Sequence, residues 1–158
     1  MNTAMTKMIK LGLPIVVCLA LGFLSSLFQR EALKNWYPFL KKSPLTPPDG
    51  VFPIAWTALY VCMGWSLGLI LNTGLPDRKF FVWLFAAQLL FNVAWSLTFF
   101  YFKYPPGGLI TIVILEIMIL CYAVLAWSLR RASSILFLPY AAWVGFATYL
   151  NFYIVMNN

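Results

Sequence analysis

The sequence predicts an all-α integral membrane protein, a bundle of five transmembrane helices with a long first connector that acts as a lid. Three observations predict this fold. The chain of 158 residues is 63% hydrophobic and only 9% charged, whereas soluble domains carry roughly 25% charged residues. Its apolar residues gather in five runs, each long enough to cross ~30 Å of hydrocarbon. Short polar or proline-containing turns separate the last four runs.

The five expected spans cover residues 9–28, 53–71, 80–102, 109–129 and 135–156, and they form one domain over residues 1–158. Lys7 and Lys10 precede the apolar core of the first run, which is the pattern of a signal peptide. The run is long for that purpose and no clear A-x-A site follows, so we expect a retained helix. The short turns at 72–79 and 103–108 predict that successive helices are antiparallel neighbours.

The first connector, residues 29–50, differs from the other turns in length and composition. Its four prolines, including Pro47 and Pro48, exclude a long regular helix across it. Trp36 and Tyr37 are amphipathic rings suited to the headgroup level of a bilayer. Because a long connector in a compact protein is often functional, we expect this segment to cover a ligand cavity.

Charge and residue usage exclude several function classes. The net charge of +7 comes from basic residues that lie almost entirely outside the apolar runs, which indicates anchoring at a membrane surface rather than nucleic-acid binding. Six basic residues would lie on one side and five on the other, so the sequence does not assign an orientation. The chain has no His and its three cysteines are far apart, so we expect no metal site and no required cofactor.

Polar and aromatic side chains recur at helical spacing inside three spans. The stripes comprise Phe52, Trp56, Tyr60 and Met63; Gln88, Asn92, Trp95 and Phe99; and Tyr140, Trp143, Ala147, Asn151 and Ile154. One interpretation is that Asn92 and Asn151 only join helices through hydrogen bonds. The other is that large rings beside small residues leave an apolar pocket with a few placed donors, suited to a flat hydrophobic ligand.

Two further features carry alternatives that the sequence leaves open. Glu116 is the only carboxylate inside a span, and it is either a functional acid or a protonated or hydrogen-bonded group facing a neighbouring helix. Gly64 and Gly68 form a G-x-x-x-G pattern, which marks either a dimer face or an ordinary close helix crossing.

The ordered set of motifs resembles the TspO/MBR translocator-protein family, which includes tryptophan-rich sensory proteins and peripheral benzodiazepine receptor homologues. The matches cover most of the chain from Trp36 to Asn151. They are Trp36-Tyr37-x-x-Leu40-Lys41, Thr46-Pro47-Pro48, Trp56-x-x-Leu59-Tyr60-x-x-x-Gly64, Gln88-x-x-x-Asn92-x-x-Trp95-Ser96-x-x-Phe99-Phe100 and Pro139-Tyr140-x-x-Trp143-x-x-Phe146-Ala147-x-x-Leu150-Asn151.

The resemblance implies a ligand-binding protein of a bacterial cell membrane, often dimeric, that takes porphyrins such as protoporphyrin IX or haem-type tetrapyrroles and drug-like isoquinolines or benzodiazepines. It would act as a sensor, carrier or scavenger, with the bilayer and a possible second copy as partners. The expected ligand-binding residues, with Gln88 added from its stripe, are Tyr37, Pro47, Phe52, Trp56, Tyr60, Gln88, Asn92, Trp95, Trp143, Phe146, Ala147 and Leu150.

Departures from the family pattern and competing functions limit these expectations. Leu45 replaces a lid tryptophan, and no basic residue follows Tyr153, so the weak cholesterol-recognition pattern is absent. Light-dependent degradation of porphyrin, with Trp56 and Trp143 as redox-active or orienting rings, is the enzymatic alternative; no nucleophile–base pair supports catalysis in the dark. A secondary transporter or channel subunit is a second alternative, for which only Glu116 is available as an ionisable group.

Overall fold

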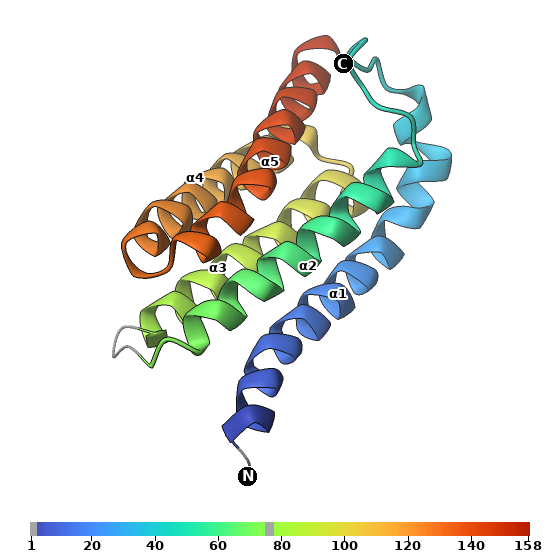
Figure 1. Cartoon of the computed structure of the whole chain (residues 1–158). Helices are drawn as coiled ribbons and strands as arrows, with labels where there is room; N and C mark the ends of the chain where they lie inside the picture. Colours follow the sequence, from blue (N-terminus) through green and yellow to red (C-terminus); the bar gives the residue numbers. More distant parts are fainter. Residues whose placement is uncertain (1–2, 75–77) are drawn as a thin grey trace.

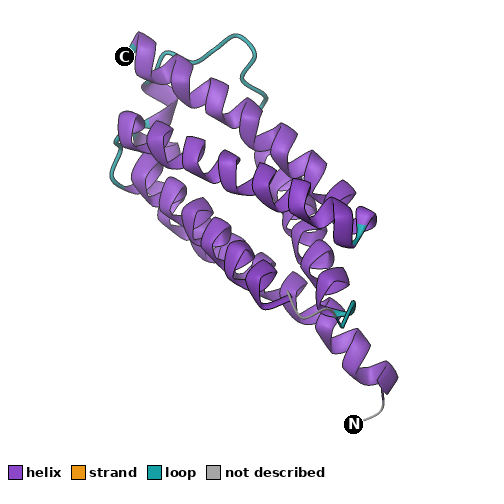
Figure 2. Cartoon of the chain, turned by 90° about the vertical axis from the view of Figure 1, so that its left-hand side faces the viewer, coloured by secondary structure: helices purple, strands orange, loops and turns teal. Residues whose placement is uncertain are grey.

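The computed structural model describes residues 3–74 and 78–158. Its elements are α1 (Thr3–Asn35), the 3-10 turn η1 (Tyr37–Phe39), α2 (Val51–Leu71), α3 (Arg78–Ser96), the π-helix η2 (Leu97–Tyr101), α4 (Pro105–Leu129) and α5 (Arg131–Asn157). The five long helices lie side by side as one bundle (Figures 1 and 2). Each is long and apolar enough to cross a membrane, and the predicted five-helix membrane fold is confirmed.

Several helix ends differ from the predicted spans: α1 begins at Thr3 rather than at Ile9, and α4 begins at Pro105 rather than at Leu109. The helix α1 continues to Asn35, past the expected end at residue 28, because no proline lies between residue 28 and Pro38. The helix α5 begins at Arg131 rather than at Ile135, so the extended residue Arg130 alone separates it from α4. The turn expected at 72–79 includes residues 75–77, which lie outside the described part of the chain.

The helices close into a ring in which α1 packs on α2, α2 on α5, α5 on α4 and α4 on α3, while α3 and η2 return to α1. The predicted antiparallel neighbours are therefore present for α3 with α4 and for α4 with α5. The helices α2 and α3, also predicted to be antiparallel neighbours, contact each other only sparsely. Because α1 and α5 occupy the two sides of α2, a hollow can remain between α2 and α3 at one end of the bundle.

The G-x-x-x-G pattern of α2 makes the close crossing with α1. A Cβ on Gly68 would lie 2.8 Å from the Cα of Leu11, and a Cβ on Gly64 would meet the backbone of Ile15. Real Cβ atoms essentially never approach that closely, so both positions require glycine in this packing. The motif has two interpretations, a dimer face or a close helix crossing, and in this structure it forms the close crossing of α2 with α1.

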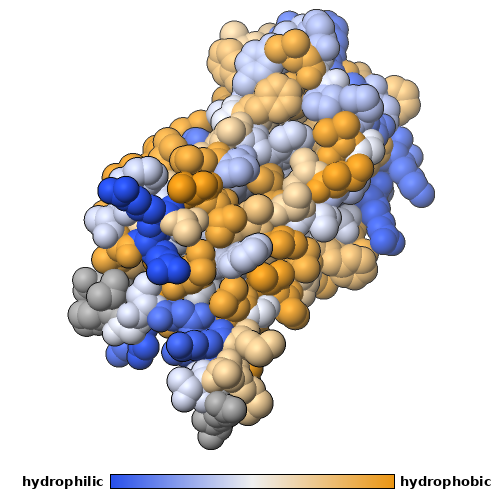
Figure 3. All heavy atoms as spheres, viewed as in Figure 1, coloured by the Kyte–Doolittle hydropathy of each residue, from blue (hydrophilic) through white to orange (hydrophobic). Residues whose placement is uncertain are grey.

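The two halves of the bundle are filled differently. Away from the lid, the rings of Tyr122 and Phe137 stack with centroids 4.0 Å apart, and Phe85 packs edge-on against Tyr122. Here the hydroxyls of Ser66 and Ser133 are 2.6 Å apart and join α2 to α5. On the face shown in Figure 3, apolar side chains cover the middle and hydrophilic ones gather toward the ends. The half of the bundle away from the lid is therefore closely packed, whereas the half beneath the lid contains a cavity.

Candidate functional site

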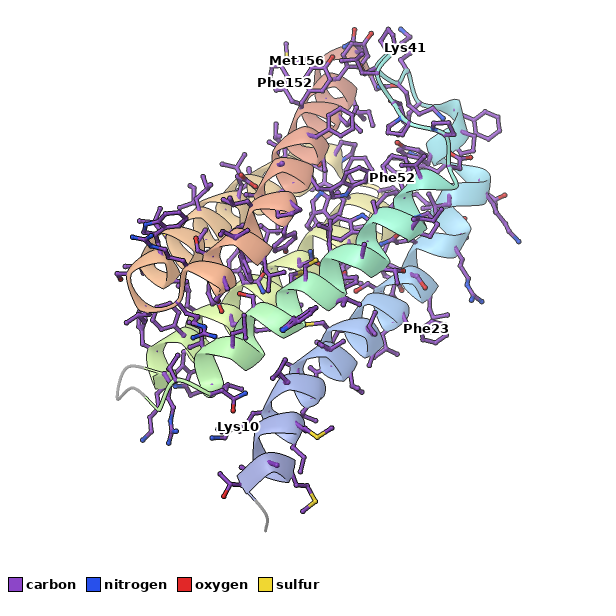
Figure 4. All side chains as sticks on the ribbon, in the orientation of Figure 1. Lys10, Phe23, Lys41, Phe52, Phe152 and Met156 are labelled. Carbon is purple, nitrogen blue, oxygen red and sulfur yellow. The ribbon has the colours of Figure 1, made fainter. Side chains whose placement is uncertain are left out.

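A cavity of about 480 Å³ lies in the lid half of the bundle. Its walls come from α1, the lid (residues 36–50), α2, α3 with η2, and α5. Phe52 lies at the start of α2 on the side facing the other helices, beneath the lid (Figure 4). Most lining side chains are apolar or aromatic, and the volume falls in the range of roughly 300–1,000 Å³ typical of small-molecule sites.

Aromatic rings from α2 and α3 form one wall of the cavity. The ring of Trp56 lies 5.9 Å from that of Trp95 at an interplanar angle of 33°, and 5.7 Å from that of Tyr60. Tyr140 lies behind them, with its centroid 6.2 Å from that of Trp56. Such offset and tilted contacts hold each ring in one orientation and present a broad aromatic surface to the hollow.

A chain of buried hydrogen bonds fixes this wall. The Tyr60 hydroxyl donates to Asn92 Oδ1 at 2.9 Å, Asn92 Nδ2 donates to the Tyr140 hydroxyl at 3.0 Å, and that hydroxyl donates to Gln88 Oε1 at 3.0 Å. Tyr60 and Asn92 border the cavity, whereas Gln88 and Tyr140 lie deeper. The Asn92 amide therefore joins α2, α3 and α5 and also lines the hollow, so the two interpretations of its role apply together.

The second amide of the stripes, Asn151, orients an indole. Trp95 Nε1 donates to Asn151 Oδ1 at 3.2 Å, and Asn151 Nδ2 donates to the Pro105 carbonyl at 2.9 Å. The amide thus bridges α3, α5 and the start of α4. Since the indole N–H of Trp95 is satisfied by the protein, its ring face is what remains available to a ligand.

The π-helix η2 places two consecutive rings on the cavity. Phe99 and Phe100 both line it, and their centroids are 4.7 Å apart. The wider turn is marked by the Phe102 N–H, which donates to the Leu97 carbonyl at 2.9 Å.

The lid is attached to the bundle by aromatic and polar contacts. The Tyr37 ring lies 5.8 Å from that of Phe100, and Lys42 Nζ lies 4.8 Å from the Tyr37 centroid. Ser43 Oγ and the Tyr149 hydroxyl are 3.0 Å apart, which connects the lid to α5. Burial, and to a lesser degree Asp49, raises the pKa of Tyr37, so its phenol stays neutral at the mouth of the cavity.

The helix α1 supplies part of the site that the sequence reasoning missed. Gly22, Ser25, Ser26 and Gln29 line the cavity, and Gln29 Nε2 donates to Ser96 Oγ at 2.8 Å across to α3. A Cβ on Gly22 would collide with the Tyr60 ring, so glycine gives the aromatic wall its space. The signal was present: four small or polar residues at spacings of three, one and three in an otherwise apolar run.

Eight of the twelve predicted ligand-binding residues lie in the cavity lining: Tyr37, Phe52, Trp56, Tyr60, Asn92, Trp95, Ala147 and Leu150. The other four, Pro47, Gln88, Trp143 and Phe146, lie outside it. Trp143 forms a layer behind the wall, with its ring 5.9 Å from that of Phe52 and 6.0 Å from that of Phe146. Direct contact between a ligand and any of the twelve stays a prediction.

Glu116 lies apart from this site. Its Oε1 approaches the space beside Gly145 of α5, and a Cβ there would lie 3.8 Å away. Its Oε2 is buried and has no hydrogen-bond partner among residues 3–74 and 78–158. The carboxyl therefore faces a neighbouring helix, but the hydrogen bond expected for that interpretation is not present in the described part of the chain.

The fold and this geometry define a class: a multi-pass integral membrane protein with a lidded, aromatic cavity inside a five-helix bundle. The profile of the TspO/MBR family matches residues 14–156, and the chain belongs to that family. It is 39% identical to the tryptophan-rich protein TspO of Chlorobaculum tepidum, over 96% of this chain and 98% of the relative. It is 34% identical to protein CrtK of Rhodobacter capsulatus, over 87% and 85%. It is also 29% identical to the translocator protein of Bos taurus, over 87% and 83% of the two chains.

Proposed function

We propose that this protein binds a porphyrin or related flat tetrapyrrole in the lid-half cavity and serves as its sensor, carrier or scavenger. The observation that carries the proposal is the cavity of about 480 Å³ with the Trp56 and Trp95 rings on one wall. Burying a large conjugated ring against aromatic faces removes much apolar surface from water. Membership of the TspO/MBR family is consistent with this ligand class.

The polarity of the cavity suits an amphipathic macrocycle. Its depth is apolar and aromatic, while Lys42 and Asp49 lie in the lining contributed by the lid. A porphyrin with acidic substituents would place its ring inward and a carboxylate toward Lys42 Nζ, where the charges attract. Asp49 would disfavour a second carboxylate at the same position, so the two lid charges give the ligand a preferred orientation.

The proposal is tested by a substitution that fills part of the cavity with an apolar side chain and removes no polar group. Ala147 is buried in the lining, and Ala147→Phe places a phenyl ring in the space assigned to the ligand. We expect the dissociation constant for protoporphyrin IX in detergent, followed by quenching of tryptophan fluorescence, to rise at least tenfold. Ala142→Phe is the matched control, because Ala142 is an exposed residue of the same helix. Equal affinity of both variants and the parent protein would contradict the proposed site.

Light-driven degradation of the bound porphyrin by dioxygen is the second candidate, and the contact of Trp56 with Trp95 and Tyr60 favours it. A cluster of oxidisable rings beside the macrocycle could pass an electron to or from the excited ligand. Trp143, outside the lining, would act on it only through Phe52. The proposal expects new bilin-like absorbance bands under light that disappear in Trp56→Phe and persist in Trp143→Phe. Bleaching no faster than that of free porphyrin would remove this candidate.

A further inference from the structure

A second hollow, of about 260 Å³, lies at the end of the bundle opposite the lid. It is formed where the first turns of α1, the end of α2 and the junction of α4 with α5 meet. Its lining consists of Lys7, Leu11, Leu69, Asn72, Thr73 and Arg130. It shares no lining residue with the lid-half cavity, and Lys10 and Lys41 mark the two opposite ends in Figure 4.

The charged side chains that line this hollow, Lys7 and Arg130, are both positive. Lys7 and Arg130 are exposed, and neither forms an ion pair with a carboxylate among residues 3–74 and 78–158. The adjacent Arg131 is engaged differently, with its guanidinium 5.5 Å from the centroid of the Trp127 ring. Lys7 on α1 and Arg130 between α4 and α5 therefore face one recess, and neither has a carboxylate partner in the described ranges, which favours an anion between them.

The rest of the lining is half polar and half apolar. Asn72 Nδ2 donates to the carbonyls of Lys7, at 3.3 Å, and Gly68, at 3.1 Å, so the amide holds α1 against α2. Its Oδ1 is buried and has no partner in the described ranges, which leaves an acceptor beside the cations. The half-buried side chains of Leu11 and Leu69 complete the wall with apolar surface.

The geometry points to a binding site for one anionic phospholipid with a hydroxylated headgroup. The phosphate would lie between Lys7 and Arg130, a headgroup hydroxyl would donate to Asn72 Oδ1, and an acyl chain would run along Leu11 and Leu69. The hollow lies where membrane-spanning helices end, which is the depth at which a lipid phosphate is found. Basic pockets between transmembrane helices bind anionic headgroups for this reason.

The experiment counts lipid bound to the purified full-length protein. Dioleoylphosphatidylglycerol is titrated into the detergent-solubilised protein, and native mass spectrometry reports the affinity of the first bound lipid; dioleoylphosphatidylcholine is the neutral comparison. A cation near an anionic lipid surface contributes about a fivefold change in binding. We expect Lys7→Gln with Arg130→Gln to weaken phosphatidylglycerol binding roughly thirtyfold and phosphatidylcholine binding by less than twofold.

The matched control is Lys34→Gln with Lys41→Gln, which removes the same charge at the lid end and should leave the affinity unchanged. Equal losses in the two double variants would overturn the site, because net charge alone would then explain binding. Displacement of the lipid by inorganic phosphate at millimolar concentration would also overturn it, since an ionic site without an acyl groove would account for that result. If the double variant does not fold by circular dichroism, each single variant must still cost about fivefold.

Discussion

The hydroxyl of Tyr140 is the point at which the buried hydrogen-bond chain can be tested most directly. It accepts from Asn92 Nδ2 and donates to Gln88 Oε1, both at 3.0 Å, and its side chain is fully buried. Tyr140→Phe removes one oxygen and leaves the shape of the ring. Interhelical hydrogen bonds in membranes contribute about 0.6 to 1.7 kcal/mol each. The loss of two should therefore lower the free energy of unfolding by about 1 to 3 kcal/mol.

The same network predicts that Gln88→Met destabilises the parent protein but stabilises the Tyr140→Phe variant. Gln88→Met in the parent protein removes the acceptor of the Tyr140 hydroxyl and should cost about 1 kcal/mol. In the Tyr140→Phe background the Gln88 amide has no partner in the described chain, because its Nε2 is already unpaired. Replacing a buried, unpaired amide by an apolar side chain of similar size should then stabilise the protein by about 1 kcal/mol.

The assay is reversible unfolding in mixed micelles with increasing dodecyl sulfate, followed by circular dichroism. Tyr104→Phe is the control, because Tyr104 is 56% exposed and the substitution should change the free energy of unfolding by less than about 0.5 kcal/mol. If Gln88→Met cost the same with and without the Tyr140 hydroxyl, the two groups would not be paired, and the network described above would be wrong.

Two further predictions concern the helix crossing and the lid. Gly64→Ala forces a methyl group against the backbone of Ile15 and should destabilise the bundle by about 1 to 3 kcal/mol in the same assay, whereas Gly12→Ala, with open space around it, should leave stability unchanged or slightly higher. Ser43→Ala removes the hydroxyl contact with Tyr149 and should speed stopped-flow release of protoporphyrin about fivefold. Tyr149→Phe removes only this contact, whereas Ser43→Ala also removes the bond from the Leu45 N–H at 3.2 Å. Tyr149→Phe should therefore add nothing to Ser43→Ala; additive effects would mean that the two side chains hold the lid separately.

Much of the site could be predicted from the helical periodicity of the sequence. Spacings of three and four placed Phe52, Trp56 and Tyr60 on one face, and Asn92 and Trp95 on another, and all five border the cavity. Periodicity works here because lipid leaves a buried amide or phenol few partners outside the bundle interior. It could not separate Ala147, which lines the hollow, from Trp143 one turn earlier, which packs behind it.

The sequence by itself determined that the chain spans a membrane five times, because the length and apolarity of a run decide whether it can cross hydrocarbon. It also determined which faces of α2, α3 and α5 turn inward. Only the tertiary structure decided that α1 joins the site through Gly22 and Gln29, and that Phe99 and Phe100 both line it. The reason is that a cavity is the volume that packed helices fail to fill. That volume depends on how α1 crosses α2, which the residues of one segment alone do not set.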